Sequence, residues 1–449
     1  MDRLKKINFN KFLTLYILIQ PVLDVLTSLL VRNISASLTI GVFVRTIFMA
    51  IIVIFSMRVL NKKDKIILFA YYVLLAVYSI IYMLICYLNT GTNMILIQIK
   101  GLVKTLYLPV VLASMFVLYK SEKIRIDIRH LVYTLCSYCF VIVFAKYFDI
   151  GYASYTYGTK LGTVGWFYAA NEIGAILAIL APYIFIKKLK KENNTFYIIT
   201  YILLVCSVLE IGTKVPVLAF AILLLLDIFV IGYKRIITKE RKYEKKFLGA
   251  LLSILFIACI IGITPVGKNL NINLINTNQN ISDDHVDNSM EDNNAYNNLP
   301  DDTMGTFSGD ITSGRTGFLK TNYQEYINNK FTTVLFGTSY LKVDDGEVIE
   351  KKLVEMDFFD IFINHGIIGF ILILGPMMLI TVYVIFKNLK HFKKLLEEPE
   401  RLYYLYAYFI GLAVSFLSGH VLTSPAVSIY IVISLILNIQ IINSVDTKE

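Results

Sequence analysis

The sequence predicts an all-α integral membrane protein with about twelve transmembrane helices and one large extracytoplasmic loop. The chain has 449 residues, of which 56% are hydrophobic and only 17% are charged. Soluble domains carry about 25% charged residues. The apolar runs do not alternate with polar residues, and many reach the roughly 20 residues that a helix needs to cross the hydrocarbon. Because lipid offers no water to backbone N–H and C=O groups, such runs cross the membrane as helices.

Twelve apolar runs meet this description, and most are separated by short polar loops. The first run is too long for the apolar core of a cleavable signal peptide. The predicted organisation is therefore nine helices in residues 1–264, an extracytoplasmic loop in 265–357 and three helices in 358–449. The runs are residues 12–31, 38–57, 66–88, 102–119, 130–150, 166–186, 196–211, 215–232, 247–264, 358–386, 402–419 and 425–442.

The distribution of Lys and Arg predicts the orientation of these helices. Six connecting segments rich in Lys and Arg all fall on one side of the membrane if there are twelve spans, and cytoplasmic loops carry such an excess. Both termini are then cytoplasmic and the long loop lies outside. This bias accounts for the net charge of +10, so no nucleic acid is expected as a partner. The six segments are residues 3–11, 58–65, 120–129, 187–191, 234–246 and 387–401.

Several ionisable residues fall inside the first apolar runs, where such residues face a bundle interior or a cavity. Asp24 and Arg45 either pair with each other, or Arg45 serves an anion site open to the outer leaflet. Lys100 and Lys104 stand four residues apart and share one helix face. They either extend to the lipid headgroups or hold an anion between them, for which the deeper Lys104 is the better candidate.

Two further charges lie at predicted helix ends on the outer side. Glu172 lies about one turn into the sixth run, and it either pairs with a nearby Lys or takes part in chemistry. Lys214 follows a tight turn, and Pro216 lies near the first turn of the next helix, where its missing N–H costs nothing. Backbone N–H groups at a helix N-terminus favour anions. Lys214 therefore either contributes to a phosphate site or contacts Glu210 within the same turn.

The long polar segment divides into two parts. Residues 265–311 are dense in Asn and Asp and lack apolar periodicity, so they are expected to be flexible, because they bury too little surface to offset the entropy of ordering. Residues 312–357 are expected to be ordered. Apolar side chains recur there at helical spacing, which predicts a helix along the membrane surface. They are Phe318, Leu319, Tyr323, Tyr326 and Ile327.

Short motifs along the chain together resemble the O-antigen ligase and Wzy-type polymerase family of bacterial membrane glycosyltransferases. The resemblance implies a GT-C-like fold in the plasma (inner) membrane. It also implies transfer of a glycan from undecaprenyl pyrophosphate to an acceptor hydroxyl, without a metal or another cofactor. Two positions depart from the family: Thr213-Lys214 replaces a common Ser-Arg, and Glu355 stands where ligases often carry His. The motifs are residues 165–182 with Asn171-Glu172, Gly212-Thr213-Lys214, Ser313-Gly314-Arg315, Leu335-Phe336-Gly337 and residues 355–369.

The chemistry implied by this resemblance requires cations, because the leaving group is a lipid pyrophosphate. Arg315 is the first candidate, since a guanidinium forks onto phosphate oxygens. Lys214, Lys104 and Arg45 are the second candidates for binding the pyrophosphate.

The acceptor hydroxyl must lose its proton, which calls for a general base within hydrogen-bond reach. Glu355 and Asp357 are the candidates, followed by Asp360 one turn later. Glu172 and His420 are further candidate site residues, to which the sequence assigns no separate role. The alternative for any single carboxylate is a polar helix start, where acids favour the N-terminal dipole. The alternative for His420 is a hydrogen bond at a helix end.

Three functions remain open from the sequence. The first is a polymerase of lipid-linked repeat units for a capsule, an exopolysaccharide or an O-antigen-like glycan. The second is a ligase that transfers the finished glycan to another acceptor. The third is a flippase or transporter, although no inverted repeat or pair of broken helices is visible. A flippase and a chain-length regulator are the protein partners that a polymerase would imply.

Overall fold

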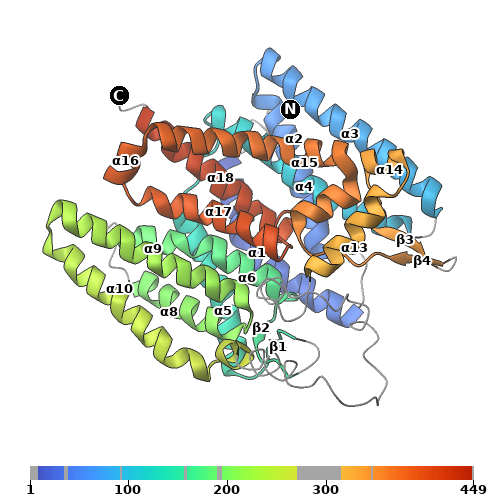
Figure 1. Cartoon of the computed structure of the whole chain (residues 1–449). Helices are drawn as coiled ribbons and strands as arrows, with labels where there is room; N and C mark the ends of the chain where they lie inside the picture. The colour runs from blue at the N-terminus through green and yellow to red at the C-terminus, as the bar shows by residue number, and fades with distance from the viewer. Residues whose placement is uncertain are drawn as a thin grey trace.

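The computed structural model describes residues 9–34, 39–91, 94–155, 159–189, 195–270, 315–344 and 347–446. These ranges are predominantly helical, with two small β-hairpins (Figure 1). Of the segment predicted to be flexible, residues 265–270 are helical. Its remaining residues, and Ser313-Gly314 of the motif before Arg315, lie outside the described residues.

Within the described ranges, nine helices are long and apolar enough to cross a membrane. Two shorter apolar helices coincide with the seventh and eleventh predicted runs, namely α8 (Thr195–Glu210) and α17 (Arg401–Leu417). The sixth predicted run is divided at Ala181 into α6 (Ala170–Leu180) and α7 (Pro182–Leu189). The nine are α1 (Phe9–Ile34), α2 (Ile40–Val59), α3 (Lys62–Thr90), α4 (Ile95–Lys120), α5 (Ile128–Tyr147), α9 (Lys214–Thr238), α10 (Arg241–Ile260) with its continuation η2 (Ile261–Ile263), α15 (Asp357–Lys390) and α18 (Pro425–Asp446).

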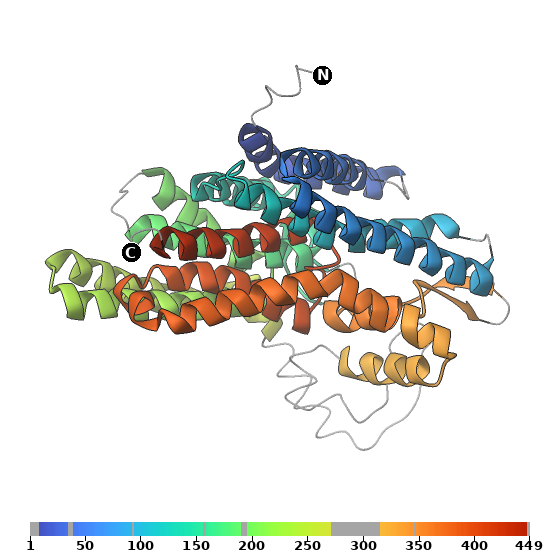
Figure 2. The same ribbon diagram turned by 90° about the horizontal axis from the view of Figure 1, so that it is seen from above.

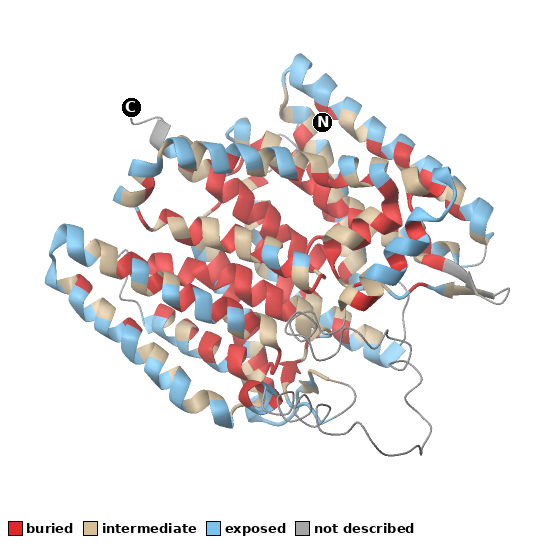
Figure 3. Cartoon of the chain, in the orientation of Figure 1, coloured by how far each residue is buried: buried red, intermediate tan, exposed pale blue. Residues whose placement is uncertain are grey.

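The helix α18 forms the centre of the bundle and packs against α4, α17 and α6. In the most apolar stretch of each helix, 89% of the residues of α18 are buried inside the protein, against 6% of those of α10. Figure 3 shows this contrast between the buried centre and the exposed outer helices. A helix that is apolar on all sides belongs inside a bundle or in lipid. The burial therefore separates the core helix from the helices that face the lipid.

The described part of the long loop lies beside the first turns of α15. It contains α13 (Arg315–Ile327), α14 (Phe331–Phe336) and the antiparallel hairpin of β3 (Leu341–Asp344) and β4 (Glu347–Glu350). Figure 2 shows α13 and α14 projecting from the side of the long helices. All five apolar residues of the predicted surface helix lie in α13, and α14 is a second short helix that follows it. A second antiparallel hairpin, β1 (Tyr152–Ala153) and β2 (Thr163–Gly165), connects α5 to α6, and α16 (Phe392–Glu397) precedes α17.

The helix α15 is interrupted at Gly366, which has a φ of +66° and a ψ of −174°. A Cβ at this position would lie 2.5 Å from the carbonyl carbon of Leu335 and 2.6 Å from the nitrogen of Gly337. The backbone N–H groups of Thr338 and Ser339 donate to carbonyls of the interrupted turn, at 2.9 and 3.3 Å. Irregular backbone at membrane depth requires partners of this kind. The turn after α14 and the Gly-x-x-Gly motif therefore form one packed unit.

Candidate active site

Arg315 and Glu355, the two leading candidates from the sequence, form an ion pair. Arg315 is the first residue of α13, and its Nη2 donates to Oε2 of Glu355 at 2.8 Å. The Arg315 side chain is 14% exposed, whereas that of Glu355 is 41% exposed. The Nε atom of Arg315 is buried and meets no acceptor among the described residues. A buried donor without a partner is costly, and the Nε–H of Arg315 is left unsatisfied among the described residues.

His420 approaches Glu355 from the segment between α17 and α18. Its Nε2 lies 3.9 Å from Oε1 of Glu355. The neighbouring imidazole and the Arg315 guanidinium lower the pKa of Glu355 to about 2. Burial lowers the pKa of His420, but the carboxylates of Glu355, Glu172 and Asp357 outweigh burial and raise it above its usual value. The structure thus unites a guanidinium, a carboxylate and an imidazole that stand far apart in the sequence.

Asp360 holds the backbone on both sides of Glu355. Its Oδ1 accepts from the N–H of Val354 at 2.9 Å, and its Oδ2 accepts from the N–H of Met356 at 3.1 Å. Glu355 has a φ of +62°, a left-handed conformation that is uncommon for a residue with a side chain. The two hydrogen bonds of Asp360 therefore fix the direction in which the Glu355 side chain points.

Asp357 holds the backbone at His420. Its Oδ1 accepts from the His420 N–H at 3.0 Å, and its Oδ2 accepts from the Val421 and Leu422 N–H groups at 2.8 Å each. The hydroxyl of Thr423 donates to Oδ1 at 2.6 Å. The residue is only 1% exposed. With four hydrogen bonds accepted, this carboxylate is committed to positioning the segment that carries His420.

Glu172 and Lys104 lie on the flank of this cluster. The Ser424 hydroxyl donates to Oε1 of Glu172 at 2.7 Å, which ties the start of α6 to the same segment as His420. Lys104 is half-buried on α4 and interacts electrostatically with Glu172, Lys100 and Arg45. Of the cations ranked second from the sequence, Lys104 is therefore linked through Glu172 to the segment that carries His420.

Arg45 is enclosed in the bundle and forms an ion pair with Asp24. Its Nε and Nη2 donate to Oε1 of Gln20 at 3.1 and 2.8 Å. The Tyr138 hydroxyl donates to the other oxygen of Asp24 at 2.5 Å. Of the two alternatives that the sequence left open, the pairing of Asp24 with Arg45 is confirmed.

Lys214 is the first residue of α9, after a Gly212 with a φ of +77°. The side-chain amide of Asn269 donates to the Gly212 carbonyl at 2.9 Å and thereby braces the turn. Glu210, the alternative partner of Lys214, lies 3.8 Å from Lys146. The Thr213 Oγ1 atom is buried and without a partner in the described ranges. The turn therefore retains one unused polar group beside Lys214.

The sequence reasoning did not single out His365, which is 0% exposed and precedes Gly366. Its Nδ1 lies 3.0 Å from the Tyr78 hydroxyl, and its Nε2 lies 2.8 Å from the Tyr340 hydroxyl. Tyr340 also hydrogen-bonds to the Thr105 hydroxyl at 2.7 Å. Because both ring nitrogens have partners, His365 connects α3, α4 and the loop at the interruption of α15. A His next to the Gly-x-x-Gly motif was the only signal for it in the sequence.

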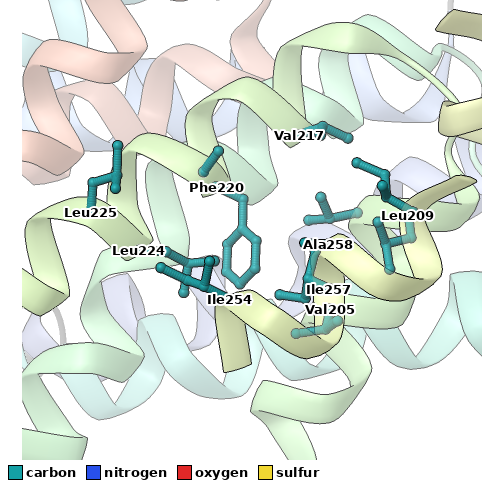
Figure 4. Close-up of a pocket in the computed structure, with 12 residues that line it drawn as sticks. Val205, Leu209, Val217, Phe220, Leu224, Leu225, Ile254, Ile257 and Ala258 are labelled. Carbon is teal, nitrogen blue, oxygen red and sulfur yellow. The ribbon is translucent and has the colours of Figure 1, made fainter. Parts of the chain in front are cut away.

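A separate recess of about 370 Å³ lies between α8, α9 and α10 (Figure 4). None of these helices carries Arg315, Glu355 or His420. The lining offers no side-chain donor or acceptor, so it is not where a glycan would be oriented. The lining residues are Val205, Val208, Leu209, Val217, Phe220, Ala221, Leu224, Leu225, Ile254, Ile257, Ala258 and Ile261.

Comparison with known proteins gives one family match that covers nearly the whole chain. Residues 6–444 match the family described as O-antigen ligase like membrane protein. No curated protein and no solved structure matches the chain. The match spans α1 to α18 and includes the segments that contribute Glu172, Arg315, Glu355 and His420. The chain therefore belongs to the family of O-antigen ligase like membrane proteins.

Proposed function

We propose that this chain is a polymerase of undecaprenyl-pyrophosphate-linked oligosaccharide repeat units at the outer face of the plasma membrane. Membership of the family indicates a lipid-linked glycosyltransferase that acts as a membrane glycan ligase or polymerase. The observation that supports the proposal is the buried Nε–H of Arg315, which has no acceptor in the described structure, beside the Glu355–His420 pair. The remaining sequence predictions of twelve spans and cytoplasmic termini are part of the proposal.

Arg315 would hold the pyrophosphate of the donor. As the bond between the anomeric carbon and the phosphate oxygen breaks, the electron pair leaves with the pyrophosphate, whose negative charge increases. A fixed guanidinium stabilises such charge more in the transition state than in the ground state. Lys104 and Lys214 are the further cations that we assign to the lipid pyrophosphate. Arg45 is the weakest of these assignments, because Asp24 and Gln20 already occupy its guanidinium.

The acceptor hydroxyl would attack the anomeric carbon while its proton passes to the Glu355–His420 pair. Asp357 and Asp360 fix the backbone around this pair, so the proton acceptor needs little reorganisation when the substrates arrive. Preorganised groups of this kind are the largest single source of rate enhancement in many enzymes. The reaction transfers the reducing end of one glycan to a hydroxyl of the next.

The choice of polymerase over ligase follows from the position of Glu355. Ligases of the resembling family often carry His at this place, and this chain supplies its imidazole from a different segment. A ligase remains the second candidate, and the two functions differ in the product that accumulates without the enzyme. A strain that lacks a polymerase keeps single lipid-linked repeat units, whereas a strain that lacks a ligase still makes long lipid-linked polymer.

The test is complementation of a deletion strain with Arg315→Ala, followed by gel sizing of its lipid-linked and released glycans. We expect single repeat units with Arg315→Ala and full-length polymer with Arg235→Ala. Arg235 is the matched control, because it forms a comparable pair with Glu244 at 3.2 Å and has no part in the proposed site. Normal polymer from Arg315→Ala would remove Arg315 from the mechanism. Movement of labelled lipid-linked sugar across vesicles by the purified protein alone would instead indicate a flippase.

A further inference from the structure

We propose that His420 is the general base of the transfer reaction and that Glu355 orients its imidazole. This assignment rests on the proposed function and refines it. The sequence favoured Glu355 or Asp357 as the base and offered a helix-end hydrogen bond as the alternative for His420. The contacts around the three residues point to a different division of their roles.

The two ring nitrogens of His420 face different surroundings. Nε2 is directed toward Glu355, at 3.9 Å from its Oε1. No described residue hydrogen-bonds to Nδ1, and the side chain is 35% exposed. One nitrogen is thus held by a carboxylate while the other remains open to a substrate. Catalytic hydrogen bonds are often long without substrate and shorten in the reacting complex.

The backbone at His420 is held in place by Glu355 and Asp357. His420 has a φ of +60°, and Gly419 before it has a φ of +62°. A Cβ at Gly419 would lie 2.6 Å from the carbonyl of Glu355, so only glycine permits this close approach. Three consecutive N–H groups, beginning with that of His420, donate to Asp357. Left-handed residues with side chains persist where the surroundings fix them, commonly at functional sites.

Glu355 is a poor base in this arrangement. With a pKa of about 2, which His420 and Arg315 lower, its carboxylate has little tendency to accept a proton near neutral pH. The imidazole has a raised pKa because carboxylates face it from three elements: Glu355 before α15, Glu172 on α6, and Asp357 and Asp360 on α15. The positive charge on the other side of Glu355 is the Arg315 guanidinium, which donates to Oε2 of that carboxylate. An effective general base has a pKa near the working pH.

The proton balance of the step is simple. The hydroxyl O–H bond breaks, its oxygen forms the new bond to the anomeric carbon, and its proton moves to Nδ1 of His420. The bond from that carbon to the phosphate oxygen breaks, and the electron pair leaves with the pyrophosphate. The Glu355 carboxylate then stabilises the imidazolium, as the carboxylate does in serine hydrolase triads. Water removes the proton before the next cycle.

The test uses the purified full-length chain in lipid vesicles, a synthetic oligosaccharide on a polyprenyl pyrophosphate, and initial rates across pH. We expect His420→Asn to lower kcat about 10²-fold or more, the usual contribution of a general base. Asn tolerates the left-handed backbone. Added imidazole should restore part of the rate of His420→Gly, which an indirect structural role would not explain. His391→Asn, at the opposite end of α15, is the matched control.

The pH profile shows whether Glu355 acts as the general base or orients the imidazole of His420. The base must be neutral, so the wild-type rate should fall as the pH drops through the raised pKa of His420. Glu355→Gln should retain measurable activity, and this fall should move to lower pH because the partner that raises the pKa is gone. A near-wild-type rate and an unchanged profile in His420→Asn would overturn the assignment. An inactive wild-type protein would overturn the proposed function, and the assignment with it.

Discussion

The chain contains two arginine–carboxylate pairs at positions that the sequence marks as candidate phosphate sites, and they differ in how completely they are satisfied. In the bundle, Asp24 and Arg45 are closed in by Gln20 and Tyr138. At the loop, Arg315 keeps a buried Nε–H without an acceptor in the described structure, and Glu355 is 41% exposed. The first pair has its Nε, one Nη and its carboxylate engaged by protein partners, whereas the second leaves a buried donor without a partner among the described residues.

This difference shows that a charge at membrane depth is not in itself a sign of function. Intramembrane charges are costly and are therefore paired or placed in cavities. What distinguishes a binding site is a donor or acceptor that the protein itself leaves unsatisfied. We expect the Asp24–Arg45 pair to matter for folding and the Arg315–Glu355 pair to matter for the reaction.

The largest effect on stability should follow the loss of one partner from the closed pair. Arg45→Ala leaves Asp24 as an uncompensated buried charge, which costs about 3–5 kcal/mol. The double variant Asp24→Leu/Arg45→Met removes both charges and should recover most of this loss. The free energy of unfolding, measured by denaturant titration in mixed micelles, gives both values. A stable and inactive Arg45→Ala protein would make Arg45 part of the reaction site and would end the distinction between the pairs.

The converse result is expected for the open pair. Arg315→Lys keeps a positive charge but loses the forked geometry that fits phosphate, and the transfer rate should fall about 10²-fold. The free energy of unfolding should change by less than about 1 kcal/mol, as for a partly exposed ion pair. Rates with purified donor and unfolding in the same micelles test both statements. A large loss of stability with normal activity would show that this pair, too, is structural.

The sequence predicted much of the fold, because apolar runs and helical spacing are local signals. Each predicted run is occupied by a helix or, in the sixth, by two. Nine helices of the described part meet the length and composition of a span. The division at Ala181 falls directly before Pro182, which has no N–H for the helical ladder. The interruption at Gly366 depends on contacts with the turn after α14, so the run of apolar residues does not reveal it. The count of twelve spans remains a prediction.

The sequence predicted the members of the candidate site better than their roles. Arg315 and Glu355 were the leading candidates for two different roles, and Nη2 of Arg315 lies 2.8 Å from Oε2 of Glu355. The position of His420 beside Glu355 depends on how the segment after α17 folds onto the start of α15, and no local pattern encodes that contact. The same contact gives Asp357 its four hydrogen bonds. The sequence alone suggested that this carboxylate was free to act as a base, and it did not predict these bonds.

A smaller effect should come from the interruption that positions the open pair relative to the bundle. Gly366→Ala places a Cβ against the backbone of Leu335 and forces alanine into a φ of +66°. Such strain costs about 1–3 kcal/mol. We expect reduced stability and a rate loss that Gly375→Ala does not show, because a Cβ at Gly375 in α15 would only reach ordinary contact with the Ile371 side chain at 4.0 Å. Equal behaviour of the two variants would mean that the interruption does not position the site.

The smallest effect concerns the free energy of unfolding at acidic pH. It tests whether the Arg315–Glu355 pair contributes to the stability of the fold. Glu355 has its pKa lowered from 4.5 to about 2 by His420 and Arg315. A carboxylate with a lowered pKa stabilises the fold above its ordinary pKa, and this contribution disappears as the pH falls through the lowered value. Because the side chain is 41% exposed, solvent screening limits the contribution to less than about 1 kcal/mol. The unfolding free energies of wild type and Glu355→Gln should therefore differ slightly at pH 6 and converge as the pH approaches about 2. A difference that grows on acidification would mean that protonated Glu355 is the stabilising form, and Arg315 would then not be its principal partner.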